Sequence, residues 1–367
     1  MSALFRPFAL GDVVLANRIV VSPMCQYVAE DGRATDWHVA HYGGLAQSGA
    51  GLLIVEATAV EPDGRITPGD LGLWDDATEA ALANIVAAVR RHSTVRLGLQ
   101  LSHAGRKASS RVPWEGGAQI ASADGGWPAD APSTVPHRDG EEPPRGLDRS
   151  GIERVVRAFS EAARRARRLG FDVVEVHAAH GYLLHQFLSP LANYRDDEYG
   201  GTPEARMRMP LAVLAAVREA FPGPIGVKVS VSDWTAGGLD LDQSIGIAAA
   251  LRDGGAAWIT ASSGGVSSAQ RIEIRPGYQL PFAAGIRRAV SVPTLAVGLV
   301  TEPAQAEAVV ADGTADLVAL ARGMLWNPRW GWYAAAALGG RVDAAPPYWR
   351  APPNGAEVFT RSVHGAR

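Results

Sequence analysis

Short apolar segments alternate with longer amphipathic segments along most of this chain. The apolar segments are rich in Val, Ile and Leu, which is typical of parallel strands buried on both faces. We expect strands at 19–24, 52–57, 96–101, 172–177, 225–231, 257–261, 294–298 and 317–321. The amphipathic segments predict helices at 76–91, 152–169, 203–220, 242–253 and 303–312.

The order of these elements predicts the fold. Eight strands that alternate with helices are typical of a (β/α)8 TIM barrel, an α/β fold in a single domain. Pro203 and Pro303 stand where helices are expected to begin, and Gly170 stands where one should end. A doubly wound open sheet is the alternative. It requires a glycine-rich dinucleotide motif after its first strand, and none follows Met24.

Two regions depart from the alternation. Residues 108–149 hold many prolines and glycines without a clear period, which predicts a long loop excursion after the third strand, over the barrel mouth. From residue 344 the chain is again rich in proline. We therefore expect a barrel at 1–343 and a C-terminal tail at 344–367.

Composition excludes several functional classes. A net charge of −3 produces no field that would hold a polyanion, so we expect no nucleic-acid partner. No apolar run reaches the length of a membrane span and no signal segment is evident, so we expect a cytoplasmic protein without a membrane partner. Cys25 is the only cysteine, which excludes an intrachain disulfide framework and a four-thiolate metal or iron–sulfur site.

The most informative motif is His-Ala-Ala-His-Gly-Tyr, from His177 to Tyr182, at the end of a predicted strand. Two imidazoles and a phenol at this position can polarise a carbonyl oxygen and deliver a proton beside it. Metal ligation by His177 and His180 is the competing interpretation. It lacks a third ligand, because we take Glu175 to point away from His177 along the strand, and we expect no metal.

Five motifs lie in order along the chain: SPMCQY at 22–27, VEATAV at 55–60, QLSHAGRK at 100–107, HAAHGYL at 177–183 and DEYGG at 197–201. Together they resemble the Old Yellow Enzyme family of FMN-dependent ene-reductases, in its bacterial thermophilic-like and xenobiotic reductase branch. The resemblance spans roughly residues 5–350 at barrel-like spacing. It implies a TIM barrel that binds FMN at the C-terminal ends of the strands.

The resemblance also implies how FMN would be held. Residues after the first strand would run along the flavin ring, Ala59 would allow close approach, and Gln100 would pair with the pyrimidine edge. The residues implied are Ser22, Pro23, Met24, Cys25, Ala59, Gln100, Lys228, Gly298, Ala321 and Arg322. Burial at a strand end is the alternative for Gln100, and a salt bridge at the barrel rim is the alternative for Arg322.

Two of these residues depart from the family pattern. Lys228 stands where the family usually has arginine, close to flavin N1 and the C2 oxygen. Lysine keeps the charge but loses the planar fork of donors, which bears on the flavin potential and affinity. Ala321 stands where relatives often have glycine before Arg322. Alanine is tolerated there if its φ is negative, and Arg322 can still bind phosphate.

By the same resemblance, His177 and His180 would bind the carbonyl or nitro oxygen of the substrate, and Tyr182 or water would protonate its α-carbon. Cys25 would modulate the flavin rather than act as a nucleophile, with a small buried hydrophobe as the alternative. Tyr27 would bind the substrate from above or simply pack.

The tail carries the last residues that the resemblance singles out. Trp349 and Arg350 would enter a neighbouring active site as substrate-binding residues, which implies a homodimer or homotetramer. A solvated chain end is the alternative.

We therefore expect an NAD(P)H-dependent FMN oxidoreductase that reduces electron-poor alkenes in a ping-pong sequence, with NADPH or NADH as reductant. The alternatives are a relative dedicated to one biosynthetic or desaturation step, a flavin-binding protein that has lost catalysis, and a metal-dependent barrel hydrolase. Iron–sulfur relatives on the same barrel need a cysteine cluster, which one cysteine excludes.

Overall fold

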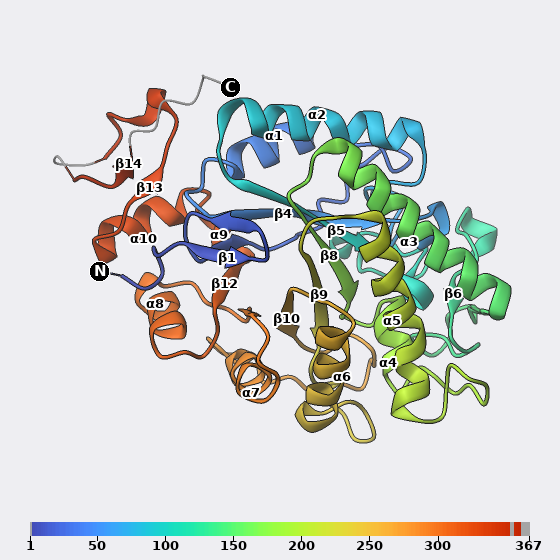
Figure 1. Cartoon of the computed structure of the whole chain (residues 1–367). Coiled ribbons are helices and arrows are strands. Elements are labelled where there is room, and N and C mark those ends of the chain that lie inside the picture. The colour runs from blue at the N-terminus through green and yellow to red at the C-terminus, as the bar shows by residue number, and fades with distance from the viewer. Residues whose placement is uncertain (1, 353–355, 361–367) are drawn as a thin grey trace.

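The computed structural model describes residues 2–352 and 356–360, and within them eight parallel strands close into a barrel (Figure 1). The strands are β3 (Ile19–Val21), β4 (Leu52–Ala59), β5 (Arg96–Ser102), β8 (Val173–Ala178), β9 (Ile225–Ser230), β10 (Trp258–Ser262), β11 (Thr294–Ala296) and β12 (Leu317–Leu320). β12 pairs with β3, so the last strand meets the first. The predicted single-domain (β/α)8 TIM barrel is confirmed, and each predicted strand overlaps an observed one.

Helices surround the barrel (Figure 1). They are α1 (Asp36–Leu45), α2 (Asp76–His92), α3 (Arg149–Leu169), α4 (Leu183–Leu188), α5 (Pro203–Ala220), α6 (Leu241–Asp253), α7 (Leu280–Val290), α8 (Pro303–Ala311), α9 (Arg322–Trp326) and α10 (Trp330–Leu338). Short 3-10 turns lie at Pro62–Gly64, Gly105–Lys107, Pro113–Glu115, Ser122–Asp124 and Pro346–Tyr348. The five predicted helices form, with Pro203 and Pro303 in first turns and Gly170 ending α3 at a φ of +81°.

Several helices carry no periodic signal that could have predicted them. All six residues of α4 are buried, so this helix has no polar face. α1 contains Gly43 and Gly44, which lower its intrinsic helix propensity. Tertiary packing therefore forms these helices where the local pattern does not indicate them.

The barrel interior changes from apolar to polar along its axis. At the N-terminal end, a hairpin of β1 (Phe8–Leu10) and β2 (Val13–Leu15) packs against Trp258 and aliphatic side chains of the barrel strands. The Trp258 indole leaves room only for glycine on the neighbouring strand β9, since a Cβ at Gly226 would lie 1.9 Å from the indole ring. The indole Nε1 donates to the Thr260 hydroxyl at 3.2 Å, where the polar part of the interior begins.

The excursion predicted at 108–149 follows the third barrel strand and contains only short elements, among them β6 (Asp130–Ala131) paired with β7 (Arg145–Gly146). Arg154 of α3 donates to Asp130 at 2.6 Å and to Glu61, which follows β4. Arg145 donates to the other Asp130 oxygen at 2.9 Å. We call Glu61, Asp130, Arg145 and Arg154 the charged clamp, because they tie the excursion to the barrel.

The described part of the tail packs on its own chain. β13 (Val342–Asp343) pairs with β14 (Phe359–Thr360), and Val342 and Phe359 share a buried cluster with Ala335 of α10. The Trp349 indole donates to the Ala344 carbonyl at 2.9 Å. Residues 353–355 and 361–367 lie outside the described residues. The division at 343/344, the reach of the tail into a neighbouring subunit and the oligomeric state all stay predictions.

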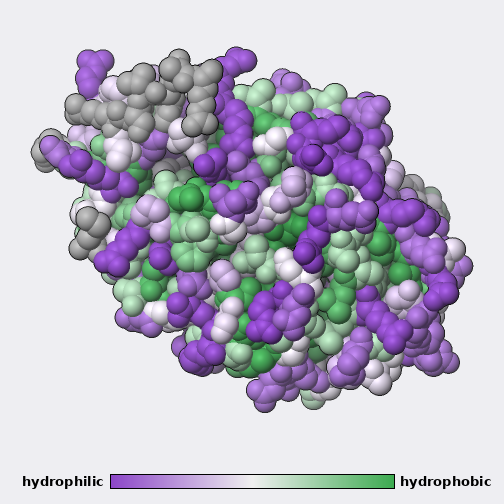
Figure 2. Space-filling model, in the orientation of Figure 1, coloured by the Kyte–Doolittle hydropathy of each residue, from purple (hydrophilic) through white to green (hydrophobic). Residues whose placement is uncertain are grey.

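The surface is mixed in character. Figure 2 shows charged and polar residues over much of the face in view, with apolar residues in patches between them. Within the part of the chain that the structure describes, no helix combines the length and apolar character needed to cross a membrane.

Candidate active site

A cavity of about 260 Å³ opens at the C-terminal ends of the barrel strands. Parallel barrels place their chemistry at this end, because the loops that follow the strands meet there. Among the predicted site residues, the cavity brings together Ser22, Pro23, His180, Lys228, Gly298, Ala321 and Arg322. Ser262 and Gln279 also line it, and no sequence motif predicted them.

Two imidazoles and a phenol converge beside the cavity, as the motif at 177–182 predicts. The ring centroid of His177 lies 5.0 Å from that of His180 and 4.9 Å from that of Tyr182. His177 lies on β8, and Tyr182 is the N-cap of α4. Gly181 allows the turn between them, because its φ is +75° and a Cβ there would lie 2.0 Å from the Gly265 carbonyl oxygen.

Hydrogen bonds leave one ring nitrogen of each histidine for a ligand. The Ala179 backbone N–H donates to Nδ1 of His177 at 3.2 Å, so Nε2 carries the proton of the neutral ring. Nε2 of His180 pairs with the Ser262 hydroxyl at 2.7 Å, which leaves Nδ1. Burial lowers the pKa of both rings well below the usual value, and the Lys228 charge lowers it further. Both imidazoles are therefore neutral near pH 7.

Tyr182 keeps its proton, as a proton donor must. Burial raises the pKa of its phenol well above the usual value, and Cys25 and Tyr27 raise it further. Lys107, which the sequence reasoning missed, has its Nζ 5.1 Å from the Tyr182 ring centroid and donates to the His180 carbonyl at 2.9 Å. Its position in the QLSHAGRK motif, just after a barrel strand, is the signal that could have identified it.

Cys25 lies on the turn after β3 with its thiol protonated. Burial raises the pKa of this thiol well above the usual value, and the carboxylates of Asp70 and Glu56 raise it further. A protonated thiol is a poor nucleophile, which argues against nucleophilic catalysis by Cys25. Cys25 and Tyr182 pack against the same small apolar cluster at the barrel mouth.

Two other predicted residues, Met24 and Tyr27, lie on this turn, and Ala59 ends the next barrel strand. The ring of Tyr27 meets that of Trp114 in the excursion edge to face, with centroids 5.8 Å apart. Ala59 is buried at the end of β4, and Met24 is partly buried against the main core. The excursion thus places an aromatic side chain over the turn that carries Cys25.

A polar layer lies inside the barrel beneath the mouth. Gln100 Nε2 donates to Glu175 at 2.7 Å, and the second Glu175 oxygen accepts the Thr260 hydroxyl. Our expectation that Glu175 points away from His177 was wrong, because residues two apart in a strand share a face. Burial lowers the pKa of Lys228 in this layer, and the charge of Glu175 opposes that effect.

The structure does not bring Trp349 and Arg350 to the cavity of their own chain. Both line a separate hollow of about 670 Å³ with Arg341 and Phe359. Their predicted role in a neighbouring active site stays a prediction.

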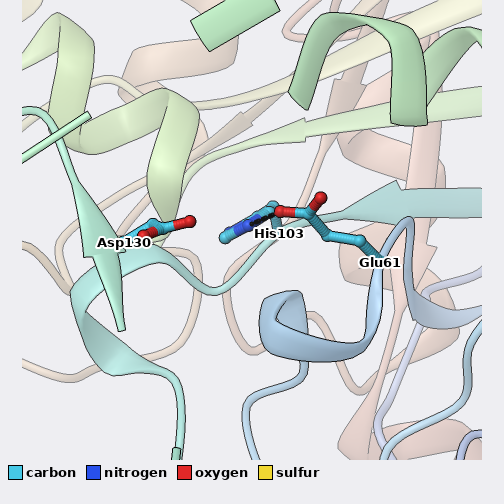
Figure 3. A group of neighbouring side chains, drawn as sticks. All are labelled: Glu61, His103 and Asp130. Carbon is cyan, nitrogen blue, oxygen red and sulfur yellow. Dashed lines mark hydrogen bonds and ion pairs between the residues drawn. The ribbon is translucent and has the colours of Figure 1, made fainter. Parts of the chain in front are cut away.

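Glu61, His103 and Asp130 form a group whose geometry could suit a metal ion, with His103 between the two carboxylates (Figure 3). Their ligand atoms already have partners. The Gly105 N–H donates to Nδ1 of His103, and Nε2 pairs with Glu61 at 2.9 Å. Because Arg154 also pairs with both carboxylates, the group belongs to an ion-pair network.

Comparison with known proteins identifies the family. A sequence profile of the NADH:flavin oxidoreductase / NADH oxidase family matches residues 3–338. The chain belongs to this family. The resemblance to Old Yellow Enzymes is confirmed, and the protein is an oxidoreductase whose cofactor is FMN.

Relatives and solved structures cover nearly the whole chain. The chain is 44% identical over 351 residues to NADPH dehydrogenase of Geobacillus thermodenitrificans (strain NG80-2), which covers 95% of this chain and 98% of that protein. It is 44% identical over 353 residues to NADPH dehydrogenase of Listeria innocua serovar 6a (strain ATCC BAA-680 / CLIP 11262), with 96% and 99% covered. Morphinone reductase aligns with a TM-score of 0.77 and 29% identity over 99% of this chain and 94% of that chain. Its complex with tetrahydroNAD aligns with a TM-score of 0.76 and 28% identity, over 99% and 96%.

The residues of this NADH:flavin oxidoreductase family member fit FMN. Lys228 is only 5% exposed, lines the cavity and makes no hydrogen bond to a described residue, so its ammonium can face the electron-rich edge of a flavin. Arg322 lines the same cavity and suits a phosphate. Gly298 has a φ of +121°, which favours glycine, whereas Ala321 has a φ of −102°, so its Cβ is tolerated.

Proposed function

We propose that this family member reduces the activated C=C bond of α,β-unsaturated carbonyl or nitro compounds with NAD(P)H. The observation that carries the proposal is the cluster of two neutral imidazoles and one protonated phenol beside the cavity. Bound FMN would supply the hydride chemistry, taking hydride from NAD(P)H and delivering it to the β-carbon of the alkene. The curated relatives are named NADPH dehydrogenases, which supports NADPH as reductant.

Each residue of the cluster has a defined part. His177 offers its Nε2–H to the substrate oxygen, and His180 offers an Nδ1–H to the same oxygen in the tautomer whose Nε2 accepts the Ser262 hydroxyl. These bonds stabilise the negative charge that grows on that oxygen as hydride adds to the β-carbon. Tyr182 or water then protonates the α-carbon, because a buried neutral phenol carries the proton that an enolate can take.

We also propose that the nicotinamide and the alkene use one site in turn, in a ping-pong sequence. The sequence lacks a dinucleotide motif after its first strand, and one cavity at the C-terminal ends of the strands is lined both by His180 and by the proposed flavin-binding residues Lys228 and Arg322. A small-molecule alkene is thus the proposed partner.

An anaerobic absorbance titration tests both half-reactions. We expect NADPH to bleach the flavin band and 2-cyclohexenone to restore it. A flavin that bleaches but is not reoxidised by enones or nitroalkenes would contradict alkene reduction and direct attention to a dedicated pathway substrate.

The oxygen-binding pair is tested by the double variant His177→Ala/His180→Ala. We expect FMN to stay bound while alkene reduction falls by about 10²–10³-fold or more, the effect typical of lost oxyanion donors. His41→Ala on α1 is the matched control and should retain activity, since His41 lies outside the cavity. Full activity in the double variant would overturn the assignment.

A further inference from the structure

Glu56 is a fully buried carboxylate that the proposed reaction does not use. It lies on β4 and is 0% exposed. The pairing of β4 with β5 shifts by one residue between Val55 and Ala57, so Glu56 occupies a bulge. Bulges beside active sites commonly redirect a side chain, and here the redirected group is an acid.

Hydrogen-bond donors from two other segments lie against the Glu56 carboxylate. One oxygen accepts the Gln26 backbone N–H at 2.5 Å, and the other accepts the Tyr42 hydroxyl at 3.1 Å. His38 Nε2 lies 3.3 Å from the second oxygen, and Nδ1 of the same ring accepts the Thr35 N–H, which directs the Nε2–H toward Glu56. These contacts fix the position of the buried carboxylate, because each of its oxygens has a partner on another segment.

The Gln26 N–H lies in the middle of the turn that carries two predicted site residues. Tyr27 on this turn has a φ of +59°, a left-handed conformation that a residue with a side chain keeps only when its surroundings hold it. The Tyr27 carbonyl also packs closely on Gly69, where a Cβ would lie 2.3 Å from its oxygen. The bond from Gln26 to Glu56 therefore anchors a strained turn.

We propose that Glu56 is a positioning residue: its bond to the Gln26 N–H, next to Cys25 in the chain, holds the turn that presents Cys25 and Tyr27 to the flavin site. Glu56 acts through these two residues and touches neither substrate nor flavin. The inference rests on the proposed function for the roles of Cys25 and Tyr27, but its geometry is independent of the reaction.

The charges around Cys25 allow the proposal to be measured. Glu56 on β4 and Asp70 in the loop after it both raise the pKa of the thiol, in addition to the effect of burial. Tyr27 and Tyr182 also face the thiol, and Lys228 faces it from β9. Removing the Glu56 charge should therefore lower the pKa of Cys25.

Alkylation by iodoacetamide as a function of pH provides the test. Cys25 is the only cysteine, so the reaction reports on one thiol and needs neither NAD(P)H nor alkene. In Glu56→Gln we expect the midpoint of the rate profile to move down by about one pH unit, or about tenfold faster alkylation below the midpoint. A rate profile that coincides with that of the unchanged protein would show that the Glu56 charge does not act on the Cys25 thiol.

Glu56→Asp separates position from charge. It keeps the charge but is one methylene too short to hold Gln26, so we expect faster alkylation at every pH with the midpoint unchanged. An unchanged alkylation rate in Glu56→Asp would overturn the positioning role. If Glu56→Gln does not fold, the result for Glu56→Asp alone decides whether Glu56 positions the turn. Glu79→Gln is the matched control and should leave the profile unchanged, because Glu79 lies on the outer helix α2 and pairs with Arg165 and Arg168.

Alkylation also distinguishes two failures. If Glu56→Gln and Glu56→Asp behave as expected but the enone does not reoxidise the flavin, the proposed function fails while the role of Glu56 stands. If reoxidation occurs and alkylation is unchanged in both variants, only the inference about Glu56 fails.

Discussion

At the scale of single residues, Lys228 links burial to cofactor binding. A lysine ammonium loses much hydration when it is buried, so its pKa falls, and in this chain Glu175 and Cys25 oppose that fall. Arginine would keep its charge in the same place, because its guanidinium stays protonated throughout the working pH range. The departure from the family pattern therefore makes the positive charge beside the flavin sensitive to alkaline pH.

We expect Lys228→Met to weaken FMN binding by about ten- to a hundredfold, the value of one charged hydrogen bond. Lys228→Arg should retain binding. The lowered pKa of Lys228 means that its charge is lost as pH rises, so FMN affinity should fall at alkaline pH in the unchanged protein and less in Lys228→Arg. Quenching of flavin fluorescence between pH 7 and pH 9.5 measures both effects. Equal affinity in Lys228→Met would contradict the assigned role.

At the scale of elements, the charged clamp decides where the excursion lies. Arg154 of α3 joins Glu61 after β4 to Asp130 of β6, three segments that are far apart in the sequence. Burial alone would raise the pKa of Glu61, but bonds from His103 and Arg154 hold it at about 2. Glu61 is therefore charged at neutral pH, and the excursion is held over the mouth by ion pairs as well as by packing.

We expect Arg154→Met to loosen the excursion and to lower the free energy of unfolding by about 1–2 kcal/mol. Breaking a fully buried pair costs about 3–5 kcal/mol, and the smaller value applies because the Arg154 side chain is 43% exposed. Hydrogen exchange of residues 119–147 should rise. Arg157→Met on the same helix is the matched control. The Arg157 side chain is 70% exposed, and its ion pair to Glu153 is long at 3.9 Å and therefore weak. Equal exchange in the two variants would disprove the role of the clamp.

At the scale of the whole molecule, buried neutral histidines set the response to acid. Burial lowers the pKa of His41 to about 4 and that of His137 to about 3, and it lowers those of His177 and His180 well below the usual value. Each of these histidines takes up a proton on unfolding once the pH falls below about 6.5. The free energy of unfolding therefore decreases as the pH decreases. Asp70 acts in the opposite sense. Burial raises its pKa to about 7, so its contribution to the free energy of unfolding decreases as the pH rises from about 4 to 7.

Because four histidines oppose one carboxyl group, we expect the melting temperature to drop by several degrees between pH 6.5 and pH 5. His41→Phe should weaken this drop, because phenylalanine takes up no proton on unfolding. The substitution breaks no hydrogen bond at Nε2, since this buried atom of His41 has no hydrogen-bond partner among the described residues. Calorimetry at the two pH values provides the measurement. A melting temperature that rises on acidification would show that Asp70 outweighs the histidines.

Much of the fold and part of the site follow from local patterns. The strands and the helices at 203–220 and 242–253 were predictable because apolar periodicity and proline or glycine signals act within a few residues. α4 was not predictable, because a helix buried on every side has no period to detect. Lys107 and Glu56 lie within recognised motifs, yet their roles depend on partners in other segments.

The sequence by itself determined the barrel, the family and the end of the barrel where the chemistry lies, because strand order and motif order both run along the chain. Only the tertiary structure decided the state of each group. Glu175 faces inward to Gln100, the Cys25 thiol stays protonated beside Asp70, and Trp114 of the excursion packs on Tyr27. These contacts join residues distant in sequence, and hydrogen bonds and pKa values depend on distance and burial in space.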